Sequence, residues 1–299
     1  MVISKVYAAY FSATDTTKHT VSEIASMIAE ILDVSLEVFD FTLPSARTAP
    51  KVFCESDLVV FGAPVYAGRV PNVLLQYLNT IKGNGALAVP VVLYGNRNYD
   101  DALIELRDLL ERGNLHTIAA AAFIGEHSFS EILAWKRPDQ KDRLKMKQFA
   151  KITADRLQRA EAPAGQLEIL PVSVSGTPFP YRGYYQPRDR QGNPVDIRKV
   201  KPVTDSCCND CKLCAEICPM GSIVFEDVSE VQGVCIKCCA CIKKCPVGAK
   251  HFNDAGYLYH QKELEEGFAR RAEPEWFFSV SLPEEPKNKT NEKGTKGEI

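Results

Sequence analysis

Two patterns of apolar and polar residues alternate along the first 160 residues. Short apolar runs, typical of buried strands, are separated by longer stretches in which apolar residues recur every three or four positions, as on one face of a helix. The strands are predicted at residues 5–11, 34–39, 58–62, 89–94 and 116–124, and the helices at 15–32, 71–81, 99–112 and 138–158. This alternation predicts a doubly wound α/β domain around a five-stranded parallel sheet.

The pattern changes after this domain, which we place at residues 1–165. Residues 166–204 form a linker whose prolines and glycines exclude a regular helix or a central strand. Its aromatic residues favour an extended segment that packs on one or both domains, with a loose tether as the alternative. A cysteine-rich domain is predicted at 205–255 and a C-terminal helix within 256–282. The tail, 283–299, is rich in Lys and Glu and is expected to be disordered.

Composition excludes several classes of protein. Of 299 residues, 45% are hydrophobic and 25% charged, as in ordinary globular proteins, and the formal net charge of −2 leaves no basic field for nucleic acid. The longest apolar stretches are shorter than the roughly 18 residues that a membrane span needs. The N-terminus has no apolar region followed by a cleavage site. We therefore expect a cytoplasmic protein without a membrane span.

Cysteines carry the strongest chemical signal. Ten of the eleven lie between Cys207 and Cys245. Within them one pattern, three cysteines at x2 spacing and a fourth after x3 followed by Pro, occurs twice, 27 residues apart. The first copy is Cys208, Cys211, Cys214 and Cys218, and the second is Cys235, Cys238, Cys241 and Cys245. In a reducing compartment such crowding favours metal ligation over disulfides.

This doubled pattern is the run of two-cluster bacterial ferredoxins, in which the fourth cysteine of each copy binds the other cluster. Two 4Fe–4S clusters are therefore predicted. Cluster I would be held by Cys208, Cys211, Cys214 and Cys245, and cluster II by Cys235, Cys238, Cys241 and Cys218. Structural zinc prefers two CxxC pairs set further apart, and its chemistry does not require the x3-Cys-Pro ending.

The remaining cysteines do not fit the spacing. Cys207 and Cys239 sit beside ligand positions, and using either would break the x2-x2-x3 order. We interpret both as free thiols packed near the clusters, with a ligand role as the alternative. Cys54, just before the third strand, is expected to be a small buried apolar residue.

Three loops follow the carboxyl ends of predicted strands, where α/β domains bind ligands. The first is Ser12-Ala-Thr14-Asp15-Thr16-Thr17, at a helix N-terminus that suits a phosphate. The second is Gly62-Ala-Pro64-Val65-Tyr66-Ala67-Gly68-Arg-Val-Pro, and the third is Tyr94-Gly95-Asn96-Arg97-Asn98-Tyr99. Tyr66 and Tyr99 are aromatic side chains able to cover a flat ring.

These loops resemble the phosphate loop and the two ring-flanking loops of flavodoxins. The chain from residue 1 to about 255 resembles the fusions of a flavodoxin-like domain to a two-cluster bacterial ferredoxin found in anaerobic bacteria. The resemblance implies a sheet of order 2-1-3-4-5, a small α+β ferredoxin domain and one FMN. It places the phosphate at Ser12, Thr14, Asp15, Thr16 and Thr17, and the isoalloxazine at Pro64, Val65, Tyr66, Ala67, Gly68, Gly95, Asn96, Arg97, Asn98 and Tyr99. Tyr99 is the expected ring stack.

Asp15 departs from the family pattern, which usually has glycine there. Its carboxylate could repel a phosphate or cap the first helix. A flavodoxin-shaped domain that binds nothing is therefore the alternative to an FMN domain. His127, after the fifth strand, is interpreted as a hydrogen-bonded loop residue, with a proton donor near the flavin as the alternative.

A chain with a flavin and two clusters can convert between one-electron and two-electron carriers. The main hypothesis is an electron-transfer protein that exchanges electrons with redox proteins, a ferredoxin-like donor or a flavoenzyme acceptor. One alternative is an oxidoreductase that reduces a small substrate with ferredoxin electrons. The other is an iron–sulfur binding or sensor protein whose flavodoxin-like domain lacks flavin.

Overall fold

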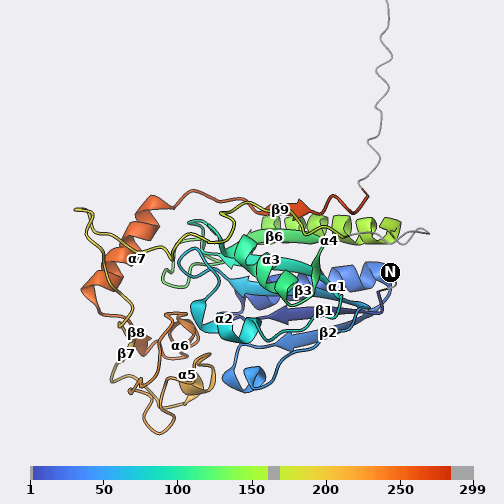
Figure 1. Cartoon of the computed structure of the whole chain (residues 1–299). Helices are drawn as coiled ribbons and strands as arrows, with labels where there is room; N and C mark the ends of the chain where they lie inside the picture. The colour runs from blue at the N-terminus through green and yellow to red at the C-terminus, as the bar shows by residue number, and fades with distance from the viewer. Residues whose placement is uncertain (1–2, 161–168, 284–299) are drawn as a thin grey trace, which may run out of the picture.

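A parallel sheet occupies the N-terminal half of the chain (Figure 1). The computed structural model describes residues 3–160 and 169–283. Its elements up to the linker are β1 (Lys5–Tyr10), α1 (Thr16–Leu32), β2 (Ser35–Asp40), η1 (Pro44–Arg47), β3 (Asp57–Pro64), α2 (Asn72–Leu78), β4 (Leu87–Tyr94), α3 (Ala102–Arg112), β5 (His116–Thr117), β6 (Ala119–Ile124) and α4 (Gln140–Ala160). Within the described residues the strand order is β2-β1-β3-β4-β6-β9, with the short β5 also paired to β4.

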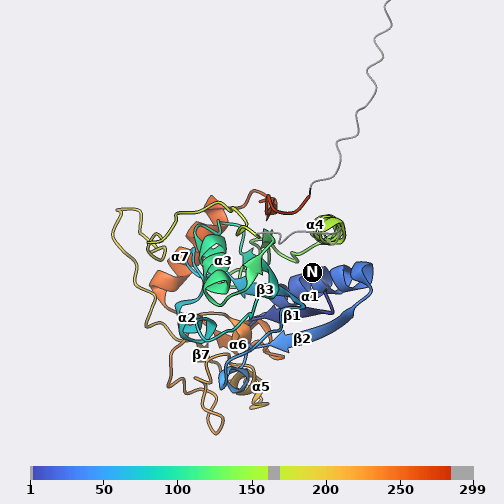
Figure 2. The same ribbon diagram turned by 45° about the vertical axis from the view of Figure 1, so that its right-hand side comes forward.

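The order 2-1-3-4 and the fifth strand, here divided into β5 and β6, agree with the predicted doubly wound sheet. β3 and β4 are buried along almost their whole length, as their continuous apolar sequences require, whereas β2 is largely exposed at one edge. Helices α1 and α4 cover one face of the sheet and α2 and α3 the other (Figure 2). No helix within the described ranges is long and apolar enough to cross a membrane.

The C-terminal part contains β7 (Val203–Thr204), α5 (Leu213–Glu216), α6 (Ala240–Lys243), β8 (Lys250–His251), α7 (Ala255–Gly267) and β9 (Glu275–Phe278). The short strands β7 and β8 pair antiparallel. Together, residues 203–251 form a cysteine module that lies beside the carboxyl ends of the sheet strands (Figure 1).

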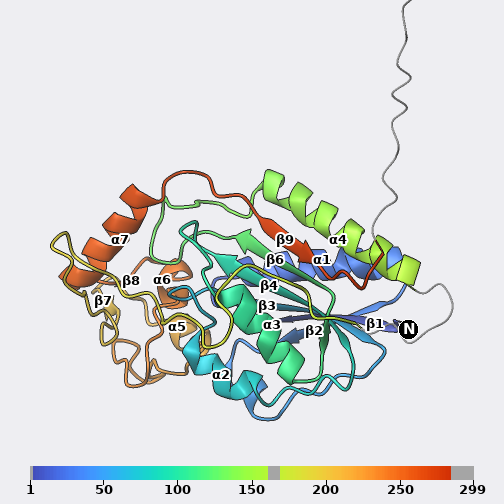
Figure 3. The same cartoon turned by 45° about the horizontal axis from the view of Figure 1, so that its top comes forward.

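Strand β9 differs from the expectation of a C-terminal helix over 256–282. Helix α7 ends at Gly267, and β9 then pairs antiparallel with β6, from Ala119 opposite Phe278 to Ala122 opposite Glu275. Trp276 and Phe278 pack on Phe149 of α4. Figure 3 shows β9 beside β6 at the edge of the sheet. The sheet therefore begins before the cysteine module and is completed after it. The predicted disordered tail, apart from Pro283, lies outside the described residues.

The described part of the linker, 169–204, is a strap held against the first domain. Buried Asp101, just before α3, accepts hydrogen bonds from the backbone N–H groups of Thr177 and Arg182, both at 2.8 Å. Tyr181 donates to Asp108 of α3 at 2.7 Å, and Tyr184 donates to the carbonyl of Val70 at 2.8 Å. These contacts favour the packed segment over the loose tether.

Candidate functional site

The two cysteine motifs repeat one another in backbone conformation as well as in sequence. Residues 27 positions apart share the left-handed region: Asp210 (φ 54°) with Lys237 (φ 54°), Lys212 (φ 63°) with Cys239 (φ 61°), and Gly221 (φ 58°) with Gly248 (φ 64°). The backbone N–H of Ser222 donates to Cys218 Sγ at 3.4 Å, and that of Ala249 donates to Cys245 Sγ at 3.2 Å. Each motif thus folds into the same loop.

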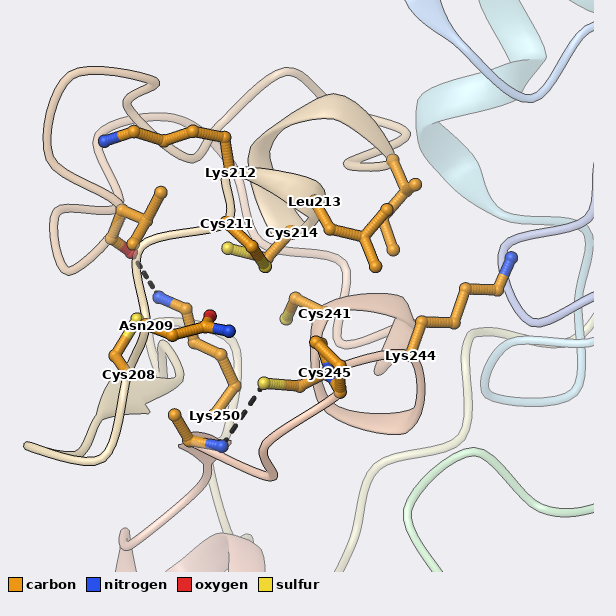
Figure 4. A pocket seen from close by; sticks show the side chains of 14 residues that line it. Cys208, Asn209, Cys211, Lys212, Leu213, Cys214, Cys241, Lys244, Cys245 and Lys250 are labelled. Carbon is orange, nitrogen blue, oxygen red and sulfur yellow. Dashed lines mark hydrogen bonds between the residues drawn. The ribbon is translucent and has the colours of Figure 1, made fainter.

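The cysteines surround two cavities. The first is lined by Cys208, Cys211, Cys214 and Cys245, which approach one space from different sides (Figure 4). The second is lined by Cys235, Cys238, Cys241 and Cys218. Cys241 borders the first cavity as well, and Cys239 borders the second. Each cavity is thus lined by three cysteines of one motif together with the fourth cysteine of the other, and Cys241 lies between the two cavities.

No three His, Cys, Asp or Glu side chains among the described residues are arranged around a single metal ion. The thiols line cavities instead. Burial, together with the neighbouring cysteines, raises the pKa of Cys238 to about 12. Burial also acts on Cys245, but backbone N–H groups of residues 247–250 outweigh it and lower the pKa of that thiol. Buried thiols of this kind become thiolates when a bound cation compensates their charge.

The cysteines outside the motif have different environments. Cys239 is buried, with its Sγ 3.5 Å from the hydroxyl of Tyr257, and burial raises the pKa of its thiol to about 12. Cys207 is exposed, with its Sγ 3.9 Å from the carbonyl of Val247. Cys54 is exposed too, so the expectation of a buried apolar residue is wrong. It lies in the turn before β3, where its N–H donates to Asp57.

The first predicted flavin loop opens α1 at the carboxyl edge of the sheet. The hydroxyl of Ser12 accepts from the N–H of Lys18 at 3.0 Å and caps the helix. Thr17 is buried against Gly62, while Thr14 and Thr16 are partly exposed. The first-turn amides have no carbonyl partner within the helix and suit an anion.

Asp15 in this loop does not cap the helix with its side chain. It adopts a left-handed conformation (φ 66°), which explains why glycine suits this position in flavodoxins. Its Oδ2 lies 2.8 Å from Nζ of Lys244 in the cysteine module. The carboxylate that could repel a phosphate therefore has a cation from the other module beside it.

The second predicted flavin loop contacts the cysteine module. Tyr66 is half-buried beside Cys238, and burial, with a smaller contribution from Cys238, Cys239 and Cys235, raises its pKa well above the usual value. Pro64 and Val65 are half-buried, and the N–H of Val65 donates to the carbonyl of Leu93. Ala67 (φ 52°) and Gly68 (φ 79°) turn the chain. Tyr66 is thus the residue of this loop that comes near the cysteines of the second cavity.

The third predicted flavin loop is held by other parts of the chain. Buried Asn96 donates to the carbonyls of Phe268 and Arg270, at 2.6 and 2.7 Å. Arg97 stacks on Tyr185 of the strap, at 4.4 Å from the ring centroid, while Asn98 is exposed. These contacts give Asn96 a structural role that the sequence does not indicate.

Tyr99, expected to stack on the flavin, is 5% exposed, and its hydroxyl donates to Glu275 of β9 at 2.7 Å. Its ring packs on Tyr94, with centroids 5.6 Å apart. Tyr99 therefore packs in the core beside β9. The position of its ring does not support the expected stacking on a flavin.

His127 lies on the same edge, with its ring against Gly95, where a Cβ would come within 2.3 Å of it. Its Nδ1 accepts from the N–H of Phe129 at 3.1 Å, and burial, with the charges of His260, Lys243 and Arg97, lowers its pKa to about 3. The imidazole is therefore neutral at pH 7, as a hydrogen-bonded loop residue.

Sequence reasoning missed the residues that join the modules. Arg47 donates to the carbonyl of Pro219, next to Cys218, at 2.7 Å. Lys243 pairs with Glu126 and donates to the carbonyl of Ser130, and Lys244 pairs with Asp15. The adjacent lysines between Cys241 and Cys245 were the available signal.

Comparisons with known proteins add little. No family model and no curated protein matches the sequence. Among solved structures, a flavodoxin from the domain Archaea is similar over 52% of this chain and 99% of its own (14% identity, TM-score 0.35). A Streptococcus pneumonia flavodoxin is similar over the same shares of the two chains (15% identity, TM-score 0.34). The apo form of the NADH:FMN oxidoreductase EMOB is similar over 51% of this chain and 89% of its own (13% identity, TM-score 0.38). Likenesses this low carry no argument of their own. By its strand order, the N-terminal half has a flavodoxin-like α/β fold.

Proposed function

We propose that this chain is an electron-transfer protein with two 4Fe–4S clusters and one FMN. The observation that carries the proposal is the pair of cysteine cavities, each completed by the fourth cysteine of the other motif. That exchange follows the ligand rule of two-cluster ferredoxins. Thiols spread around a cavity suit a group larger than one ion, which favours clusters over zinc.

Features of the first domain support FMN. The strand order is that of flavodoxins, the amides at the start of α1 suit a phosphate, and Lys244 offsets Asp15. The second loop, through Tyr66, adjoins the cysteines of cluster II. A ring held near that loop would be close to the cluster, which suits transfer between them. Clusters pass single electrons, and flavin accepts one or two. Redox proteins of the cytoplasm are the proposed partners.

Composition analysis of anaerobically purified full-length protein tests the proposal. About eight iron and eight sulfide per chain are expected, with visible bands of FMN above the broad cluster absorption. Cys211→Ser or Cys238→Ser should remove or convert one cluster, whereas Cys207→Ser and Cys239→Ser, the matched neighbours, should keep both. Tightly bound zinc without acid-labile sulfide would contradict the iron–sulfur proposal, and clusters without flavin would favour the sensor alternative.

A further inference from the structure

The two cysteine motifs carry opposite charge although their backbones repeat. Residues 202–234 hold six carboxylates and one lysine, Lys212. Residues 235–250 hold four lysines and no carboxylate. Because the two halves share one fold, this difference is not required by the cysteine loops themselves.

The basic half uses its lysines inside the protein. Lys243 and Lys244 pair with Glu126 and Asp15 of the flavodoxin-like domain. Lys237 donates to the carbonyls of Arg198 and Cys235, both at 2.8 Å, and Lys250 donates to the carbonyl of Val228. Lys243 and Lys244 thus face the flavodoxin-like domain and Lys237 faces the linker, whereas Lys250 joins the two halves of the module.

The acidic half faces solvent around the first cavity. Its six exposed carboxylates are Asp205, Asp210, Glu216, Glu226, Asp227 and Glu230. Lys212 is engaged by Asp210 at 2.7 Å, and His251 lies 3.2 Å from Asp205. Val228, between the last three carboxylates, lines the first cavity, as does exposed Cys211. A partner seated on this acidic surface would lie next to the cysteines of cluster I.

We propose that this acidic surface docks a redox protein with a basic patch, and that electrons enter and leave the molecule there. The proposal rests on the proposed function, because it needs clusters in the cavities. Tyr66 of the second flavin loop lies within electrostatic reach of Cys235 and Cys238, which line the second cavity. Complementary charge would steer the encounter, raising the association rate at low salt. In the forward direction one electron leaves the reduced protein and reduces one oxidised metal centre of the partner, with no proton or bond exchanged.

Binding of basic cytochrome c to the full-length protein tests the surface directly. The variant Glu226→Gln/Asp227→Asn/Glu230→Gln should weaken binding at low ionic strength by about tenfold, and the difference should vanish at high salt. The matched control is Glu30→Gln/Asp33→Asn/Glu55→Gln, which removes three exposed carboxylates from the opposite edge of the sheet. The control should bind as the wild type does. Equal weakening in both variants, or in neither, would overturn the proposal.

A second readout uses small oxidants of opposite charge. Electron transfer from the dithionite-reduced protein to hexaamminecobalt(III), a trication, should slow about tenfold in the acidic-surface variant, whereas transfer to anionic ferricyanide should stay the same or quicken. Iron and sulfide are counted in every variant. Wild-type protein without iron would refute the proposed function, whereas full iron content with unchanged rates would refute the docking surface alone.

Discussion

Neutralising Asp15 should tighten FMN binding, and Coulomb's law gives the size of the effect for a phosphate held at the start of α1. Two unit charges about 6 Å apart interact by roughly 3 kcal/mol at an effective dielectric constant of about 20. Asp15 and Lys244 are 39% and 29% exposed, so solvent and salt reduce this to about 1 kcal/mol. Asp15→Asn keeps the size of the side chain, tolerates the left-handed backbone and leaves Lys244 free to face the phosphate. The expected gain in affinity is about five- to tenfold.

Isothermal titration of the full-length protein with FMN measures this effect. Lys244→Gln should weaken binding by a similar factor, because Asp15 then stands unpaired beside the phosphate. The double variant should return close to the wild type. Riboflavin lacks the phosphate, so its affinity should be the same for the wild type and all three variants. Equal FMN affinity in every protein would refute the electrostatic reasoning, and absence of binding in all of them would remove FMN from the proposed function.

Further substitutions test the fold around the site. In a urea titration, Phe278→Ala should lower the free energy of unfolding by about 2 kcal/mol, because its half-buried ring packs on Phe149. The control Val280→Ala, at an 85% exposed residue, should change the free energy of unfolding by less than about 0.5 kcal/mol. Gly68→Ala should destabilise the second loop by roughly 2 kcal/mol, because φ is 79° and the new Cβ would lie 2.2 Å from Asp100; unchanged thermal stability would contradict this. Burial alone would raise the pKa of Asp101, but N–H donors from the strap lower this pKa overall. The stabilisation that the Asp101 carboxylate gives the folded protein is therefore present at neutral pH. It is lost as the pH falls through the lowered pKa, below about 4. Asp101→Asn should therefore expose the strap to limited proteolysis already at pH 7, and a cleavage rate equal to that of the wild type would show that the strap is held elsewhere.

Local sequence patterns predicted the sheet, because its strands and helices depend on residues close together in the chain, and the division of the cysteines into two sets rests on the same kind of local spacing. Strand β9 escaped this reasoning. Its four residues, Glu275-Trp-Phe-Phe, are too few to show a period of two, and their partner in β6 lies about 150 residues earlier. The pairing of Asp15 with Lys244 is equally remote in sequence. The hydroxyl of Tyr99 donates to Glu275 of this strand, a contact that the sequence pattern around Tyr99 does not indicate.

Strand β9 also has a consequence for biosynthesis. The chain leaves the ribosome from its N-terminus, so every cysteine is synthesised before the outer strand of the sheet exists. Residues 125–274 form one closed loop between β6 and β9, and closing a flexible loop of that length costs roughly 4 kcal/mol, only about 0.6 kcal/mol more than a loop of half the length. The chain thus accommodates a whole module between two paired strands of the sheet for little extra free energy. The separation instead delays completion of the sheet, because the edge of β6 stays unpaired until the cysteine module has been synthesised.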